Sequence, residues 1–187
     1  MKNREKIFAF FCILGVLLFI LPETECYSQM KNMSAKDLTK ESTAVFYGKC
    51  VKIRSGWNET KDVILTYITV IPEEYIKGNL GSEAVITVPG GRVGDIIYEV
   101  SEMPFFTEGE EVVAFIWTNP AGKNLVTGGF QGKMKIEKDR QTGKRMVIGE
   151  VITEDAETQD QVPGQAKKAE RMELEDFVIK LKGYAKN

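Results

Sequence analysis

Short apolar segments rich in β-branched and aromatic residues recur between positions 43 and 151 of this 187-residue chain, at a spacing of roughly ten residues. Their apolar side chains tend to alternate, as in β-strands. Glycine- and proline-rich turns separate the segments and no helical pattern lies between them, which argues against a parallel α/β fold. The sequence therefore predicts a mainly β fold, namely a five- to seven-stranded antiparallel barrel of the OB or netrin-like type. After a first strand that starts at Thr43, strands are expected at 63–71, 84–88, 96–100, 112–117, 125–127, 132–136 and 146–151.

The N-terminus predicts export. Lys2, Arg4 and Lys6 precede an uncharged apolar stretch at 7–21, which ends at Pro22. This layout is typical of a secretory signal peptide, and the stretch is shorter than the roughly 20 residues of a transmembrane helix. We expect a secreted, periplasmic or cell-envelope protein with no membrane span after cleavage, the alternative being an uncleaved anchor. The predicted organisation is a signal peptide at 1–28, a β-barrel domain at 29–152, a polar linker at 153–168 and a C-terminal helix at 169–187.

The cysteines depend on the cleavage site. Small residues at the last and third-last positions favour cleavage after Ser28, which leaves Gln29 as the first residue, and cleavage after Cys26 is the second option. Either site removes Cys26 and leaves Cys50 without a second cysteine for a disulfide. Cys50 is predicted to be a small buried apolar residue, the alternative being a disulfide between chains.

Local signals predict the ends of several elements. Ser34, with Asp37 three residues later, is a good N-cap for a short helix or turn within 30–42. Residues 55–62 are expected to form a polar loop, and Pro72 to end the second strand or mark a sheet edge. The C-terminal helix is amphipathic, and we expect it to pack against the barrel rather than dock a partner. Its apolar stripe consists of Met172, Leu174, Phe177, Val178 and Leu181.

The composition limits the chemistry. The chain has no histidine, which removes the usual proton shuttle, the Ser-His-Asp triad and the commonest nitrogen ligand of zinc. The carboxylates at 73–74, 108 and 110–111 fall in predicted turns without a suggestive spacing, and a net charge of −2 offers no basic stripe for nucleic acid. The expectation is a protein without catalytic residues, bound metal or cofactor, and without nucleic acid as a partner.

Two glycine-rich stretches resemble phosphate-binding loops only in part. Residues 89–94 follow a strand but lead into another strand, so no helix N-terminus is available for an anion. Residues 128–133 end in Gly-Lys, but Thr127 and Met134 stand where the P-loop pattern needs glycine and Ser or Thr. Both stretches are predicted to be tight turns or bulges that only glycine fits.

Aromatic residues in or beside predicted loops offer a binding surface, because loops at one end of a barrel often carry function. The tentative ligand-binding residues are Trp57, Phe105 and Phe130, and Phe106 and Trp117 lie in similar positions. The alternative is that these rings plug the ends of the barrel.

A series of short motifs follows in order along the chain. They are Ala-Val-Phe-Tyr-Gly-Lys at 44–49, Glu-Tyr-Ile-Lys-Gly at 74–78, Val-Pro-Gly-Gly-Arg-Val-Gly at 88–94, Pro-Phe-Phe-Thr-Glu-Gly-Glu at 104–110 and Gly-Phe-Gln-Gly-Lys at 129–133. This series, which spans about residues 42–136, resembles a family of uncharacterised exported bacterial proteins. The family has no established activity, so the resemblance implies no catalytic residues.

Three motifs also resemble, more weakly, the netrin-like barrel of the tissue inhibitors of metalloproteinases. They are Val-Phe-Tyr-Gly-Lys-Cys-Val at 45–51, Glu-Glu-Tyr-Ile-Lys-Gly at 73–78 and Gly-Glu-Glu-Val-Val-Ala-Phe at 109–115. Those inhibitors chelate the protease zinc through an N-terminal cysteine, and Cys26 lies at a similar distance before the first strand. The predicted cleavage after Ser28 removes that cysteine.

Three functions remain open at this point. The first is a non-catalytic extracytoplasmic module that binds a protein through loop aromatics. The second is an inhibitor of a protease, acting through the N-terminal segment. The third is a hydrolase that uses carboxylates.

Overall fold

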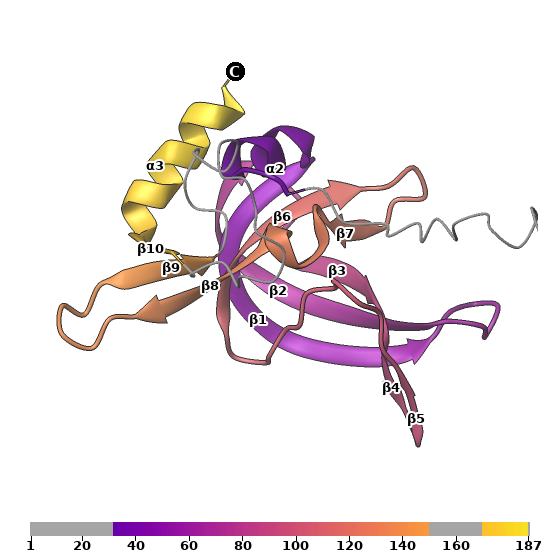
Figure 1. The fold of residues 1–187 in the computed structure, drawn as a ribbon. Helices are drawn as coiled ribbons and strands as arrows, with labels where there is room; N and C mark the ends of the chain where they lie inside the picture. The colour runs from indigo at the N-terminus through magenta and orange to yellow at the C-terminus, as the bar shows by residue number, and fades with distance from the viewer. Residues whose placement is uncertain (1–31, 150–169, 187) are drawn as a thin grey trace, which may run out of the picture.

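The computed structural model of the protein describes residues 32–149 and 170–186. The predicted signal peptide at 1–28 and linker at 153–168, and with them Cys26, lie outside the described residues. Within the described part, five strands form a closed barrel (Figure 1). Around the ring they are β1 (Ala44–Trp57), β2 (Ile64–Lys77), β3 (Ala84–Pro89), β7 (Asn124–Val126) and β6 (Glu111–Thr118), and β6 pairs again with β1.

The ring is antiparallel except at one place. β3 and β7 run parallel and meet through the single pair Ile86–Asn124. The side-chain amide of Asn124 (Nδ2) also donates to the Val85 carbonyl at 3.0 Å. The predicted mainly β fold, a five- to seven-stranded barrel with a C-terminal helix, is thus confirmed with five strands, one pairing of which is parallel. Residues 119–122 form the turn between the antiparallel strands β6 and β7.

Three further strands extend the sheet beyond β6. They are β8 (Lys133–Lys138), β9 (Arg145–Gly149) and β10 (Glu170–Glu173), and Figure 1 shows β8 and β9 leaving the barrel as a long hairpin. A separate two-stranded sheet, β4 (Gly91–Val93) and β5 (Ile96–Tyr98), projects from the opposite side. The 3-10 helix η1 (Gly129–Gly132) joins β7 to β8.

Two helices cover one side of the sheet. α2 (Ala35–Glu41) begins at the predicted N-cap, where the Ser34 hydroxyl accepts from the Asp37 amide at 3.1 Å and Asp37 in turn accepts from the Ser34 amide. α3 (Leu174–Ala185) buries its apolar stripe in its own domain, as predicted. None of the described helices is long and apolar enough to cross a membrane.

The apolar side chains form two clusters, which we call the barrel core and the helix-side core. β6 belongs to both, because its residues 112–116 are all buried and alternate between the two. A strand covered on both faces is expected to be a continuous apolar run, as this one is. The barrel core includes Phe46, Cys50, Ile68, Ile86, Phe106, Val112, Ala114 and Ile116, and the helix-side core includes Leu38, Val45, Val113, Phe115, Val147, Leu174, Phe177 and Leu181.

Cys50 lies in the barrel core with no exposed surface, as predicted. Burial raises the pKa of its thiol, so the thiol stays protonated and unreactive at neutral pH.

Several element ends differ from the expectations. β1 runs on to Trp57, so 55–57 is strand rather than loop, because it pairs with the first residues of β2. β2 continues past Pro72 to Lys77. The pairing with β3 has already ended at Val70, so proline lies on an edge, which was the other prediction for it.

The C-terminal helix begins at Leu174, five residues after the predicted start at 169. Residues 170–173 form β10 instead, in which Met172 pairs with Val147 of β9. Met172 belongs to the predicted apolar stripe of the helix, but it is extended because it pairs with β9. A strand that finds a ladder partner overrides a local helical pattern.

Candidate functional site

The three candidate aromatic residues are all at least partly exposed. Phe105 is 82% exposed and is the most exposed of the described large apolar side chains, whereas Trp57 and Phe130 are each 39% exposed. Phe106, next to Phe105, is only 4% exposed and fills the barrel core. For Phe106, the alternative prediction that the ring fills the barrel is therefore confirmed.

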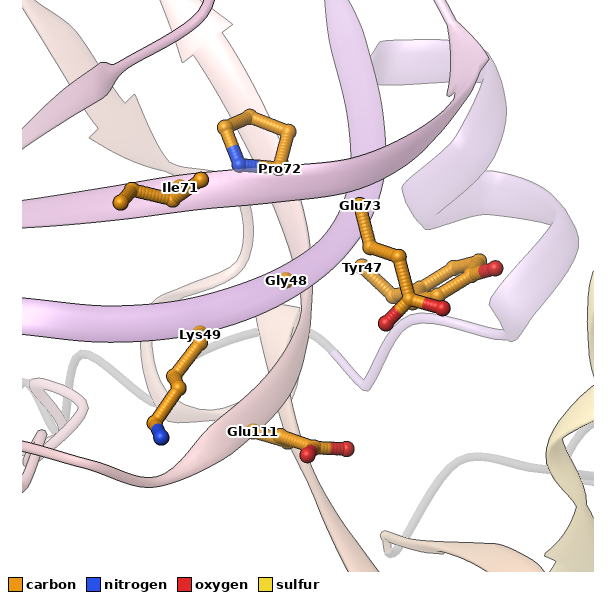
Figure 2. Close-up of a pocket in the computed structure, with 7 residues that line it drawn as sticks. All are labelled: Tyr47, Gly48, Lys49, Ile71, Pro72, Glu73 and Glu111. Carbon is orange, nitrogen blue, oxygen red and sulfur yellow. The ribbon is translucent and has the colours of Figure 1, made fainter.

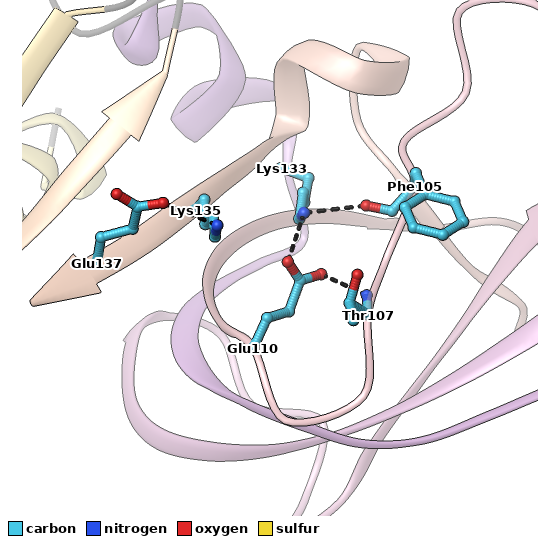
Figure 3. A network of polar contacts seen from close by, with 6 residues as sticks. All are labelled: Phe105, Thr107, Glu110, Lys133, Lys135 and Glu137. Carbon is cyan, nitrogen blue, oxygen red and sulfur yellow. Dashed lines mark hydrogen bonds and ion pairs between the residues drawn. The ribbon is translucent and has the colours of Figure 1, made fainter.

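A lysine fixes the backbone beneath Phe105. Lys133 Nζ donates to the Phe105 carbonyl at 2.9 Å and pairs with Glu110 at 3.0 Å, and the Glu110 carboxylate also accepts from the Thr107 amide at 2.8 Å (Figure 3). Lys133 and Glu110 side chains are only 14% and 9% exposed, so the pair is largely shielded from water. The ammonium group also lies 5.3 Å from the centre of the Phe106 ring.

Phe130 lies in the segment beside this one. Its amide donates to the Glu102 carbonyl at 3.0 Å, so η1 and the loop that carries Phe105 are joined by hydrogen bonds from both Phe130 and Lys133. Gly128 and Gly129 enter η1 with φ of 66° and 57°, a region that favours glycine. The predicted tight turn at this stretch is confirmed.

Trp57 lies elsewhere. It is the last residue of β1 and pairs with Ile64, whose carbonyl accepts from the Gly90 amide at the base of the β4–β5 hairpin. Among the described contacts, none joins Trp57 to Phe105 or Phe130. The structure thus joins the segments that carry Phe105 and Phe130 and leaves Trp57 at the end of the β1–β2 hairpin.

A pocket of about 280 Å³ lies against the paired strands β1 and β2, and two carboxylates line it (Figure 2). Gly48 allows the two strands to approach closely here, because a Cβ there would overlap the Ile71 carbonyl and come within 2.7 Å of Pro72 Cα. Figure 2 shows Glu73 beside the Tyr47 ring, with Glu111 farther away on β6.

Both pocket carboxylates face the same arginine of β9. Arg145 binds Glu73 through two hydrogen bonds of 2.7 and 3.0 Å and lies 3.8 Å from Glu111. Its guanidinium also lies 5.4 Å from the centre of the Tyr47 ring. The hydrogen bond from Arg145 is the main reason why the pKa of Glu73 lies below its ordinary value.

Glu74, the next residue along β2, is bound by two donors. The Tyr47 hydroxyl donates to it at 3.0 Å, and Lys182 of α3 forms an ion pair with it. The hydrogen bond from Lys182 lowers the pKa of Glu74, and burial, followed by the bond to Glu74, raises the pKa of Tyr47.

This arrangement favours a structural role for the pocket. A general acid needs a raised pKa, yet Glu73 is held ionised by a bidentate arginine. Its ion pair with Arg145 ties β2 to β9, as the Glu74–Lys182 pair ties β2 to α3. Within the described residues, no group of three acidic or cysteine side chains is placed to hold a metal ion.

Sequence reasoning missed two features. In the sequence, Lys133 stands out only as the end of a Gly-Lys motif, whereas in the structure its ammonium group binds the Phe105 carbonyl and holds that loop. The apolar run Ile96–Tyr98 was assigned to a barrel strand, but its residues are 44–55% exposed on the separate hairpin. The acidic residues Asp95 and Glu99, on either side of this short apolar run, were the signal in the sequence that the run is exposed.

No protein-family model matches this sequence, and no curated protein matches it significantly.

Proposed function

We propose that this protein is a non-catalytic extracytoplasmic binding module that holds a partner protein through Phe105, with Phe130 beside it. The observation that carries this proposal is that Phe105 is 82% exposed although its loop is firmly held. Three hydrogen bonds hold the loop: the Glu102 and Phe105 carbonyls each accept one, and the Thr107 amide donates one. The Phe106 ring, buried in the barrel core, is the fourth contact.

A ring presented in this way suits binding. Burying a phenylalanine side chain yields about 1.5–3 kcal/mol. An already ordered loop loses little conformational entropy when the partner docks, so more of that free energy remains as affinity. Aromatic anchors in rigid surroundings are a common source of binding energy at protein interfaces.

The test compares Phe105→Ala with Ile179→Ala, which removes an apolar side chain that is 69% exposed on α3. The exported protein and both variants are cross-linked to the native envelope and culture medium, and the captured proteins are quantified by mass spectrometry. We expect Phe105→Ala to reduce capture of a specific partner by about tenfold or more, and Ile179→Ala to leave it unchanged. Equal capture by all three proteins would rule out Phe105 as the contact.

Export and the family resemblance belong to the same proposal. Two of the motifs that resemble the exported bacterial family lie at these surfaces. Residues 88–94 lead from β3 into the β4–β5 hairpin, and residues 129–133 contain η1. The intact mass of the exported protein tests the predicted first residue, Gln29. A retained N-terminus would contradict cleavage.

Inhibition of a metalloproteinase through an N-terminal cysteine is the second candidate function. The closed five-stranded barrel with a helix packed on it favours this resemblance at the level of fold. The mechanism needs Cys26 as the first residue of the mature chain. The same intact-mass measurement decides it, because any other first residue removes the zinc ligand.

A further inference from the structure

The β4–β5 hairpin has an unusual surface. Its strands pair through Gly91–Tyr98, Arg92–Ile97 and Val93–Ile96, and a two-residue turn at Gly94 and Asp95 joins them. Gly94 has a φ of 61°, as the first central residue of a type II′ turn requires. The three residues of β5 are 53%, 55% and 44% exposed. Because successive side chains point to opposite faces, neither face of β5 is covered.

The base of the hairpin is nevertheless held in place. The Gly90 amide donates to the Ile64 carbonyl at 2.9 Å, and the Thr66 hydroxyl donates to the Gly90 carbonyl at 2.7 Å. Gly91 packs closely against the Ser55 and Thr66 side chains, and its φ of 132° also favours glycine. Figure 1 shows the hairpin projecting away from the barrel near the end of β1. The apolar strand is therefore presented in a fixed direction.

β5 has a free edge. Among the described strands, β5 pairs with β4 alone. Hydrogen-bonded and non-hydrogen-bonded pairs alternate along an antiparallel ladder, and the pair that flanks a two-residue turn is hydrogen-bonded. The Val93–Ile96 pair flanks the turn, so Arg92–Ile97 is the non-hydrogen-bonded pair. The amide and carbonyl of Ile97 consequently point away from β4, towards a position that an added strand would occupy.

The charges at the two ends of β5 indicate what would occupy this edge. Asp95 precedes the apolar run and Glu99 follows it; both are exposed, and neither has a partner among the described residues. A second copy paired symmetrically on β5 would place Asp95 opposite Glu99 of that copy at both ends, and like charges directly opposite are destabilising. A membrane surface fits poorly too, because Asp95 at the turn would enter the lipid first.

We propose that β5 binds an extended segment of another protein as an additional strand, and that this segment carries apolar residues flanked by lysine or arginine. Main-chain hydrogen bonds to Ile97 would supply affinity, and the basic residues would pair with Asp95 and Glu99. This surface is separate from Phe105, so the inference goes beyond the proposed function and does not depend on it.

The experiment uses the full exported protein and two fluorescent peptides, each with three central valines. One peptide has a lysine on each side of the valines and the other has a glutamate. We expect fluorescence anisotropy to show binding of the lysine peptide and at least about tenfold weaker binding of the glutamate peptide. The double variant Asp95→Lys, Glu99→Lys should reverse this preference.

Two variants separate the backbone contact from the side chain. Ile97→Pro removes the outward amide donor while leaving the ladder to β4, as proline is tolerated at sheet edges, and it should weaken binding by about tenfold. Ile97→Ala keeps the amide and should bind more tightly than Ile97→Pro. Phe105→Ala should bind the lysine peptide as the unmodified protein does, whatever the outcome for the proposed function. Thermal unfolding confirms that each variant is folded.

Four outcomes would overturn the inference. They are equal binding of both peptides, no binding of either, flotation with phosphatidylcholine–phosphatidylglycerol vesicles that Ile97→Asp abolishes, and a dimer in sedimentation that Ile97→Pro dissociates. The last two would assign the hairpin to a membrane or to a second copy. Because the charge-reversal pair lies on the surface, it keeps the test decisive even if Ile97→Pro fails to fold.

Discussion

Two hairpins leave the barrel, and they differ in how they are covered. In the β8–β9 hairpin, β10 pairs along the edge of β9, and Val147 lies fully buried in the core beneath α3. In the β4–β5 hairpin, no described strand covers the edge of β5, and Ile97 is 55% exposed. Among the described strands, the outer edge of one hairpin is therefore paired and the outer edge of the other is not. The exposed apolar strand β5 is therefore the strand edge on which our inference of a binding surface rests.

The largest expected difference between the hairpins is in hydrogen exchange. The amides of β9 lie between two strands and should open only when the domain unfolds, whereas those of β5 should open locally. We expect the opening free energies to differ by about 5 kcal/mol, which is a difference of more than about a thousandfold in exchange rate. Exchange followed by mass spectrometry measures both, and equal protection of the hairpins would contradict the comparison.

Removing the cover of the β8–β9 hairpin should cost nearly as much. Phe177 of α3 has no exposed surface, and Phe177→Ala should destabilise the protein by about 3–5 kcal/mol in urea unfolding. The matched control on the same helix is Ile179→Ala, which should change stability by less than about 0.5 kcal/mol. A small effect of Phe177→Ala would show that α3 does not stabilise the sheet that it covers.

The anchoring of the bare hairpin can be tested at its base. Gly91 has a φ of 132°, and a Cβ there would overlap Thr66 Oγ1 and lie 2.5 Å from Ser55 Oγ. Gly91→Ala should therefore destabilise the protein by about 1–3 kcal/mol in urea unfolding. Gly56→Ala on β1 serves as the control, because a Cβ there meets nothing within 4 Å. Equal stability of the two variants would mean that the hairpin is not anchored at Gly91.

The smallest expected effect concerns pH. Arg145 lowers the pKa of Glu73, so the unfolded state binds more protons and the stabilisation is present above the ordinary pKa of about 4.5 and lost as the pH falls through the lower folded value. Because the Glu73 side chain is 53% exposed, we expect a contribution of less than about 1 kcal/mol. Arg145→Gln should flatten the acid limb of a stability–pH profile. Arg92→Gln on β4 removes an exposed arginine without a described partner and should leave that limb unchanged.

Local chemistry made part of the fold predictable. The Ser34 capping box needs only four consecutive residues, and the β-branched runs identify most strands regardless of their partners. The ends of strands were less predictable, because they depend on neighbours. Pro72 lies inside β2, where no β3 partner requires an amide donor and where its partner across the ladder, Gly48, has no side chain. β10 likewise exists because β9 lies beside it.

The candidate site was predictable only as a set of residue types. In the sequence, Phe105 and Phe106 are equivalent, and only the fold directs one ring into the barrel core and leaves the other 82% exposed. The Lys133–Glu110 pair joins residues 23 positions apart, so no local pattern could show that it fixes the Phe105 loop.

The continuous burial of β6 also has a consequence for how the domain melts. Since alternate residues from Val112 to Ile116 belong to opposite cores, neither core can lose its packing while the other keeps a complete wall. The barrel and the helix-covered sheet should therefore unfold in one cooperative transition, although they look like separate layers. Partly unfolded forms that expose one apolar face of β6 should then be scarcely populated.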